Sequence, residues 1–127
     1  MAAITILGGA VSIVRLPPSA PIPAWLAGGP FTSITRTMTE LSIICGEALV
    51  PAGAQVESGW RVFAVSGPLD FGLTGILSSI ATPLAAAHVA IAAISTYDTD
   101  YILVREADVG RAEAALNGAG HHVTDAN

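Results

Sequence analysis

Apolar residues in the second half of the chain change their period several times, and each change predicts a new element. Residues 60–66, WRVFAVS, are a β-branched and aromatic run that stops at Gly67-Pro68, which indicates a strand and a turn. The next apolar residues recur at helical spacing and are expected on one helix face: Leu73, Ile76, Leu77, Ile80 and Leu84. Pro83 falls inside this pattern, which predicts a kink or a local opening but leaves its place in the helix open.

Two strands and a second helix are expected to follow. Residues 89–96, VAIAAIST, predict a strand with both faces covered, and residues 100–104, DYILV, predict its antiparallel partner in a hairpin. Residues 106–119 have acids at their start and a glycine near their end, as a helix would. Residues 121–124, HHVT, are expected as a last edge strand. The order βαββαβ predicts an α+β fold of the ferredoxin-like sandwich type.

The first half of the chain repeats part of this plan in weaker form. The run ITILGGAVSIVRL predicts strands around a glycine turn, and a proline-rich stretch then leads to a short helix at residues 24–27. Residues 31–37 and 40–45 predict another hairpin. Polar residues and Pro and Gly replace the apolar period over residues 51–59, so we expect one unit over 1–55 and another over 56–127. Each half is too small for a good core of its own, so the halves should pack together or on a second chain.

Composition narrows the possible partners. Of the 127 residues, 52% are hydrophobic and 12% are charged, which predicts a globular chain rather than a disordered one. The net charge of −5 disfavours nucleic acid and anionic membranes. The sequence has no lysine, which excludes a Schiff-base or Walker lysine. The single cysteine, Cys45, lies in an apolar run and is expected to be a buried strand residue, so a reducing, cytoplasmic compartment is the simpler expectation.

Residues 71–97 contain no charged side chain and are long enough to span a bilayer. Pro83 and His88 interrupt the segment, and its apolar period changes from helical to strand-like, so we expect no transmembrane helix. The N-terminus has no basic residue before its apolar part and is interrupted by Gly8-Gly9, which argues against a signal peptide.

The segment LDFGLTGI, residues 69–76, places glycines and a threonine where a strand gives way to a helix. It contains neither G-x-G-x-x-G nor G-x4-G-K-[ST], so a nucleotide site is poorly supported. The N–H groups at the helix start, near Thr74, Gly75 and Ile76, are suited to an anion such as a carboxylate. The alternative is that Thr74 only caps the helix and the glycines only form the turn.

A second polar group, STYDTD at residues 95–100, follows an otherwise apolar strand. Asp70, Asp98 and Asp100 would supply negative charge near a ligand amine while the helix start takes its carboxylate, so the pattern favours a small zwitterion. The alternative is simple turn chemistry, particularly for Asp98.

Enzyme chemistry is not indicated. His121-His122 has no Cys or Glu at ligand spacing, so a solvated terminal strand is favoured over a metal site. His88 ends the helix pattern, where it would interact favourably with the C-terminal end of the helix dipole. No serine lies in a G-x-S-x-G motif. We therefore predict no catalytic residue, no metal and no cofactor.

The quoted segments together carry a family resemblance. Residues 67–104, GPLDFGLTGILSSIATPLAAAHVAIAAISTYDTDYILV, resemble an ACT domain. Preceded by residues 31–45, FTSITRTMTELSIIC, they resemble small bacterial proteins with tandem ACT domains, and they are similar to aspartate kinase regulatory regions and cytosolic arginine sensors. The resemblance runs from about Ile4 to Val123, with the first ACT unit truncated.

The resemblance implies a non-enzymatic regulatory module that binds an amino acid at the interface of two ACT units. Leu73, Thr74, Gly75 and Ile76 would offer backbone donors to the ligand carboxylate, and Asp70 would stand at the entrance to their loop. The remaining site residues that the resemblance implies are Ser33 and Ile34 in the first unit and Ser95, Thr96, Tyr97 and Asp100 in the second. Asp100 matches the acid that helps to hold a basic ligand in the arginine sensors.

No effector domain is evident in the chain, so what the ligand would control is not encoded here. An alternative function is a structural or protein-interaction module with a vestigial pocket. Edge strands and small halves invite pairing, so we expect a homodimer.

Overall fold

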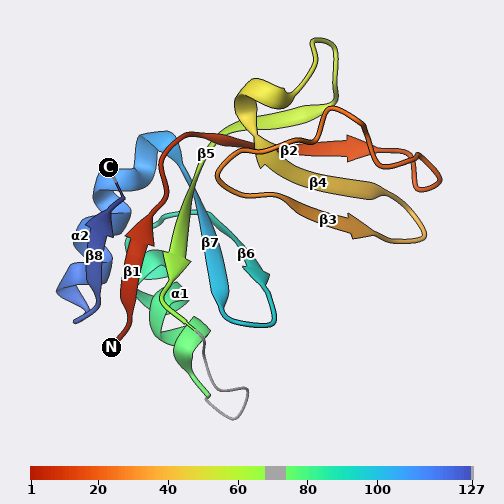
Figure 1. The fold of residues 1–127 in the computed structure, drawn as a ribbon. Coiled ribbons are helices and arrows are strands. Elements are labelled where there is room, and N and C mark those ends of the chain that lie inside the picture. The colour runs from red at the N-terminus through yellow and green to blue at the C-terminus, as the bar shows by residue number, and fades with distance from the viewer. Residues whose placement is uncertain (68–73, 127) are drawn as a thin grey trace. The chain divides into compact units, whose positions relative to one another are not determined.

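A computed structural model describes residues 1–67 and 74–126, and contacts divide the chain into two compact units (Figure 1). Unit 1 comprises Met1–Gly8 and Arg61–Asn127, and unit 2 comprises Gly9–Trp60. Strand β5 (Val56–Val65) contributes its first residues to unit 2 and the others to unit 1. A domain boundary between residues 55 and 56 stays a prediction, but the first eight residues pack with the C-terminal part of the chain.

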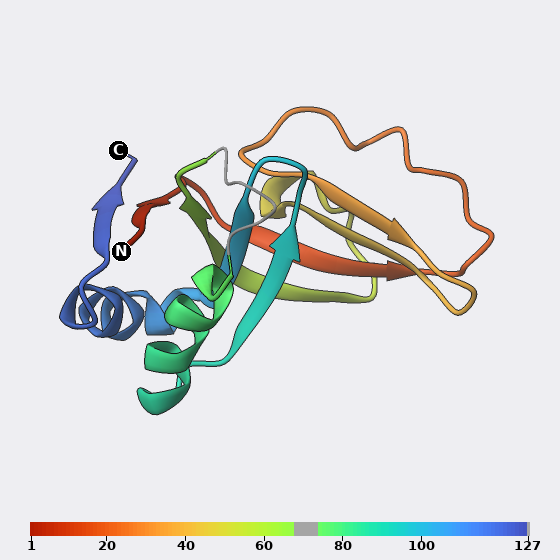
Figure 2. The same ribbon diagram turned by 90° about the horizontal axis from the view of Figure 1, so that it is seen from below.

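Unit 1 is the predicted α+β sandwich. From β5 onward its elements follow the order βαββαβ: α1 (Ile76–Ala86), β6 (Ile91–Ser95), β7 (Asp100–Arg105), α2 (Val109–Gly118) and β8 (His122–Asp125), with a 3₁₀ turn at Glu106–Asp108 before α2. Both helices lie on one face of the sheet (Figure 2). Buried residues of the sheet, such as Phe63 and Ile102, pack there with Ile80 and Leu84 of α1 and Leu116 of α2. The prediction of a ferredoxin-like fold is therefore confirmed for this unit.

An N-terminal strand enters this sheet. β1 (Ala3–Ile6) pairs antiparallel with β5, where Ile4 lies opposite Val65, and parallel with β8, where Ile4 lies opposite Val123. The strand order is β6-β7-β5-β1-β8. β8 is an edge strand, as predicted. The grouping of β1 with the N-terminal unit was wrong, because Ile4 and Ile6 bury their alternate side chains in the core of unit 1.

Helix α1 contains Pro83 in its third turn. Proline has no N–H, so the Ser79 carbonyl four residues earlier receives no helical hydrogen bond. The His121 ring supplies one instead, with Nε2 2.8 Å from Ser79 O, while His121 Nδ1 accepts the Ala2 N–H at 3.1 Å. The expectation of a solvated histidine pair was thus wrong for His121, which is 5% exposed because it satisfies these two backbone groups.

Strand β6 corrects another expectation. It was predicted to have both faces covered, but Ala93 and Ser95 are exposed and β6 pairs only with β7 among the residues that the structure describes. β6 is therefore an edge strand. The predicted hairpin with β7 is confirmed, with Ile94 opposite Tyr101 and Ser95 opposite Asp100.

Unit 2 is a sheet of order β3-β4-β2-β5, formed by the first part of β5 with β2 (Val11–Leu16), β3 (Ser33–Arg36) and β4 (Leu41–Gly46). The predicted hairpin of β3 and β4 is confirmed, with Ile34 opposite Ile43. A 3₁₀ turn, Glu47–Leu49, follows β4, and no α-helix covers the sheet of residues 9–60. That this unit is a truncated ACT unit stays a prediction.

Coil segments cover the core of unit 2. Val14, Leu41, Ile43 and Cys45 are buried, and partly buried side chains such as Trp25 lie against them. The helix expected at residues 24–27 is absent, because Pro23 and Gly28-Gly29 bound a segment of only four residues, and both glycines have positive φ. Its place is taken by a turn, in which the Leu26 N–H donates to the Pro23 carbonyl at 3.4 Å.

Among the helices that the structure describes in either unit, none has the length and apolar content needed to cross a membrane.

Candidate functional site

The N-cap residue of helix α1 has no side chain that could cap the first backbone N–H groups of the helix. Its N-cap is Gly75, with φ 79° and ψ 0°, a left-handed conformation that glycine adopts without strain. The Ser79 N–H donates to the Gly75 carbonyl at 2.8 Å, and the N–H groups of the preceding turn have no helical partner. Thr74 is exposed and does not occupy the N-cap position, so the alternative in which Thr74 caps the helix was wrong.

The turn between β6 and β7 places an acid beside a hydroxyl. Ser95 is the last residue of β6 and Asp100 is the first residue of β7, and the two form a cross-strand pair. The Ser95 hydroxyl donates to Asp100 Oδ1 at 2.5 Å. This bond holds the carboxylate of the half-buried Asp100 and leaves Oδ2 for another donor.

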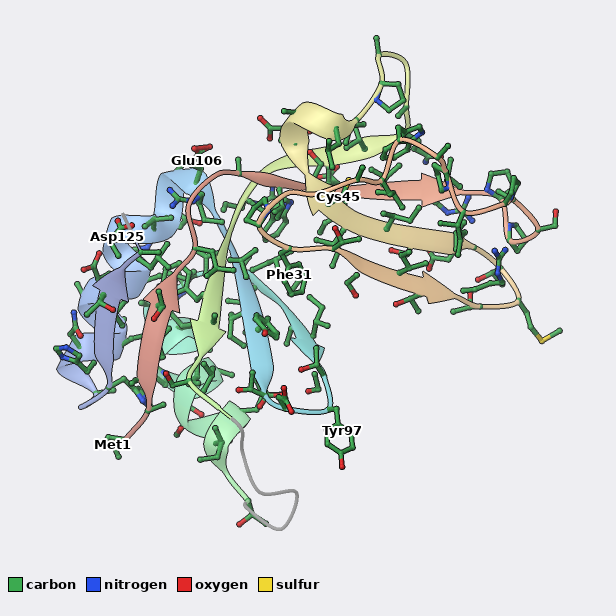
Figure 3. The ribbon with its side chains drawn as sticks, in the orientation of Figure 1. Met1, Phe31, Cys45, Tyr97, Glu106 and Asp125 are labelled. Carbon is green, nitrogen blue, oxygen red and sulfur yellow. The ribbon has the colours of Figure 1, made fainter. Side chains whose placement is uncertain are left out.

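Thr96 and Tyr97 lie in the turn and not on the strand where the resemblance placed them. The Thr96 N–H and hydroxyl both donate to the Thr99 carbonyl, at 2.8 and 3.1 Å. Tyr97 is 82% exposed and points away from the sheet (Figure 3). Its contribution to a pocket therefore stays a prediction.

Thr99 is a residue that the sequence reasoning missed. It is 8% exposed, and its hydroxyl donates to the carbonyl of Val65, the last residue of β5, at 2.8 Å. This bond ties the β6–β7 turn to the strand that precedes α1. A threonine between two aspartates has no local signal of burial, because turns accept small polar residues for several reasons.

Several predicted site residues come together at one end of unit 1. The end of β5, the start of α1 and the β6–β7 turn lie at this end in both views (Figures 1 and 2). This brings Gly75 and Ile76 to the same end of the sheet as Ser95, Thr96 and Asp100. The arrangement offers amide donors for an anion and a carboxylate for a cation within one region.

Other predicted residues lie elsewhere or are not described. Ser33 and Ile34 are on β3 of unit 2, where Ser33 is half-buried and Ile34 is 41% exposed. Asp70 and Leu73 lie outside the described residues. No group of three or more His, Cys, Asp or Glu side chains within residues 1–67 and 74–126 is arranged to hold a metal ion.

Two features of unit 2 contain none of the predicted site residues. An open groove of about 220 Å³ is lined by residues of β2, β4 and β5, including Ile13, Ser42 and Glu57, and by Arg15 and Glu40, whose side chains approach to 4.0 Å. Cys45 is buried, and burial raises the pKa of its thiol. A neutral buried thiol is unreactive, so Cys45 has a packing role.

Comparisons with known proteins define the class. A family model for the ACT domain matches residues 55–118, and a model for an N-terminal domain matches residues 9–53. The chain therefore belongs to the ACT domain family. The solved structure of protein Atu0741 from Agobacterium tumefaciens is similar over 99% of this chain and 94% of that one, with 40% identity and a TM-score of 0.93.

Two further matches are to an arginine sensor and to an aspartokinase. The cytosolic arginine sensor for mTORC1 subunit 1 of Bos taurus is 39% identical over 90 residues, which cover 62% of this chain and 27% of that protein. The chain thus matches about a quarter of the length of its curated relatives. A structure of aspartokinase α and β subunits has a similar fold, with a TM-score of 0.64 and 15% identity over 92% of this chain and 96% of that one.

Proposed function

We propose that this chain is a non-enzymatic regulatory module that binds a free amino acid at the end of unit 1 described above. The observation that carries the proposal is the pairing of opposite chemistries there. The N-cap of helix α1 is Gly75, which has no side chain to cap the helix, and the β6–β7 turn presents Asp100 with one carboxylate oxygen held by Ser95. Membership of the ACT family supports a regulatory role rather than a catalytic one.

The chemistry of the site suggests a cationic amino acid. The N–H groups of the first turn of α1 would bind the ligand carboxylate, since a helix start favours negative charge. Asp100 would accept from an ammonium or guanidinium group. The name of the related arginine sensors makes L-arginine the first candidate, and a small neutral amino acid is the second. Within this proposal Ser33, Ile34, Asp70, Leu73, Thr74, Thr96 and Tyr97 remain predicted ligand contacts.

We also propose a homodimer and a cytoplasmic location. The edge strands β6 and β8 invite pairing with a second chain, and the related sensors are described as cytosolic. The position of the ligand at an interface of ACT units belongs to the proposal as well. Asp98 and Asp100 both lie in unit 1, so the thermal-shift comparison of their variants tests binding in this unit.

A thermal-shift screen of the twenty amino acids at millimolar concentration tests the proposal. A ligand that binds only the folded state raises Tm, and we expect the largest rise with L-arginine. Asp100→Asn should abolish most of this rise, because it removes the charge with little change of shape. The matched control is Asp98→Asn in the same turn, where Asp98 is exposed. If no amino acid shifts Tm, or if Asp98→Asn has the larger effect, amino-acid binding at Asp100 is wrong.

The second candidate is a protein-interaction module with a vestigial pocket. The exposed side chains of edge strand β6 favour it, because such an edge can pair with another chain. In that case Asp100→Ala should leave the oligomeric state unchanged, while Ala93→Pro should reduce association in size-exclusion chromatography, since proline removes a backbone donor at the edge.

A further inference from the structure

The described residues include three buried polar side chains: Ser12, His121 and Thr99. The Ser12 hydroxyl forms a hydrogen bond with the Ser58 hydroxyl at 3.0 Å. His121 forms a hydrogen bond with the Ser79 carbonyl in unit 1, outside the candidate site. Thr99 is the member of this group that lies in the candidate site. It stands directly before Asp100 in the chain.

The N–H, the carbonyl and the hydroxyl hydrogen of Thr99 each have a defined partner. Its carbonyl accepts from the N–H and the hydroxyl of Thr96, and its own N–H donates to Thr96 Oγ1 at 3.3 Å. Its hydroxyl donates to Val65 at 2.8 Å. The local bonds close the turn on itself, and the hydroxyl ties the turn to strand β5.

The bond to Val65 has a geometric consequence. β5 and β7 are neighbours in the sheet, and Thr99 precedes the first residue of β7. The bond from the Thr99 hydroxyl to the Val65 carbonyl therefore links β5 and β7 one residue before β7 begins. β5 leads toward the start of α1, so the same bond fixes the turn that carries Asp100 at the end of unit 1 where α1 begins.

We infer that Thr99 is a positioning residue of the ligand site, which holds Asp100 and Thr96 in register with the start of α1 without touching the ligand. This inference rests on the proposed function. A site that recognises both ends of a zwitterion needs a fixed distance between its donors and its acid. If the residues that hold these groups are loosely packed, the affinity for the ligand falls. Thr99 provides this support at the carbonyl of Val65.

The test compares Thr99→Val with Thr99→Ser. Valine keeps the shape and removes the hydroxyl, and serine keeps the hydroxyl. With L-arginine as the titrant in calorimetry, we expect Thr99→Val to bind about tenfold more weakly than the wild type, and Thr99→Ser to bind within about threefold of it. Ser12→Ala is the control for general destabilisation, because it removes a buried hydroxyl bond in unit 2, and its affinity should be unchanged.

The outcomes separate the two hypotheses. Equal affinity of Thr99→Val and the wild type overturns the positioning role while amino-acid binding stands. If the wild type binds neither L-arginine nor any other amino acid, the proposed function is wrong and the inference falls with it.

Hydrogen exchange of the wild type keeps the inference testable if Thr99→Val does not fold. L-arginine should protect the amides of Thr99 and Ser66 together, because the Thr99 bond joins the turn to β5. Protection of the turn without any change at Ser66 would overturn the inference.

Discussion

Unit 1 and unit 2 both present a sheet face that must be covered, but they cover it by different means. In unit 1, two helices pack over a buried cluster that includes Phe63 and Ile102. In unit 2, coil segments that include the proline-rich residues 17–23 pack over a buried cluster that includes Ile43 and Cys45. A helix presents a continuous apolar stripe, whereas coil covers a sheet with isolated side chains.

This difference concerns binding as well as stability. The helix that buries Ile80 and Leu84 in unit 1 also brings an N-terminus, whose first N–H groups have no helical partner, to the end of the sheet. Unit 2 has no such terminus in residues 9–60. The comparison therefore predicts that unit 1 is the more stable unit and that ligand effects are centred there.

The largest expected effect comes from a matched pair of buried isoleucines. Ile102 on β7 of unit 1 is 1% exposed, and Ile43 on β4 of unit 2 is 0% exposed. Truncation to alanine costs about 2 to 5 kcal/mol at such positions. We expect Ile102→Ala in the upper half of this range and Ile43→Ala in the lower half, because coil around Ile43 relaxes into the cavity more easily.

Urea unfolding followed by fluorescence measures both variants. A larger loss for Ile43→Ala than for Ile102→Ala would contradict the view that unit 2 has the more adaptable core.

The next effect concerns the hydrogen bonds by which His121 joins helix α1 to the N-terminal residues of unit 1. His121→Ala leaves the partly buried Ser79 carbonyl and Ala2 N–H without their partner, and we expect a loss of about 1 kcal/mol, at the lower end of the range for an unsatisfied buried group. In a Pro83→Ala background the loss should be smaller, because residue 83 then has an N–H for the Ser79 carbonyl. Chemical denaturation of the four proteins of this double-mutant cycle gives the coupling.

His122→Ala is the matched control, since His122 is exposed, and it should change the free energy of unfolding by less than about 0.5 kcal/mol. Additive effects of His121→Ala and Pro83→Ala would show that the histidine does not compensate for the proline.

Local pattern predicted most of unit 1 and less of its connections. The alternation in β7 and the helical spacing in α1 each follow from neighbouring residues, so both elements were predicted. The partner of β1 was not, because Ile4 and Ile6 define a buried face without specifying which strand lies beside it. His121 and Val123 are buried while His122 and Thr124 are exposed, so the period of two in HHVT contained a signal that was overlooked.

The candidate site was predictable to a similar extent. Glycine before an apolar helix indicates an open helix start, and the place of Asp100 after an apolar strand predicted it as a ligand contact, which stays a prediction. Thr99 was missed because its burial depends on Val65, 34 residues earlier in the chain. Long-range hydrogen bonds of this kind leave no trace in local composition.

Another effect separates backbone strain from ligand binding. Gly75 in unit 1 has φ +79° and Gly53 in unit 2 has φ +85°, and a Cβ at either position meets no atom within 4 Å. Alanine at each position should therefore cost a similar amount, about 1 to 3 kcal/mol, from the left-handed backbone alone. Only Gly75→Ala should also reduce the rise in Tm that L-arginine produces, because it disturbs the start of α1. An equal ligand response in the two variants would remove α1 from the site.

The smallest effect is confined to unit 2 and follows from Cys45. Burial raises the pKa of the thiol, so its ionisation favours the unfolded chain. Its contribution to stability is fully present below the unfolded pKa of about 8.5 and is lost as pH rises through the folded value. We expect the free energy of unfolding to fall more steeply above pH 8.5 in the wild type than in Cys45→Val.

Labelling of Cys45 by a thiol reagent gives the matching kinetic test of the two units. Cys45 is the single cysteine of the chain and is 0% exposed, so its labelling reports the opening of unit 2. Ile43→Ala should accelerate labelling under native conditions more than Ile102→Ala does, because it weakens the core that contains the thiol. If Ile102→Ala accelerates labelling as much, the two units open together and the difference between their cores has no separate effect on unit 2.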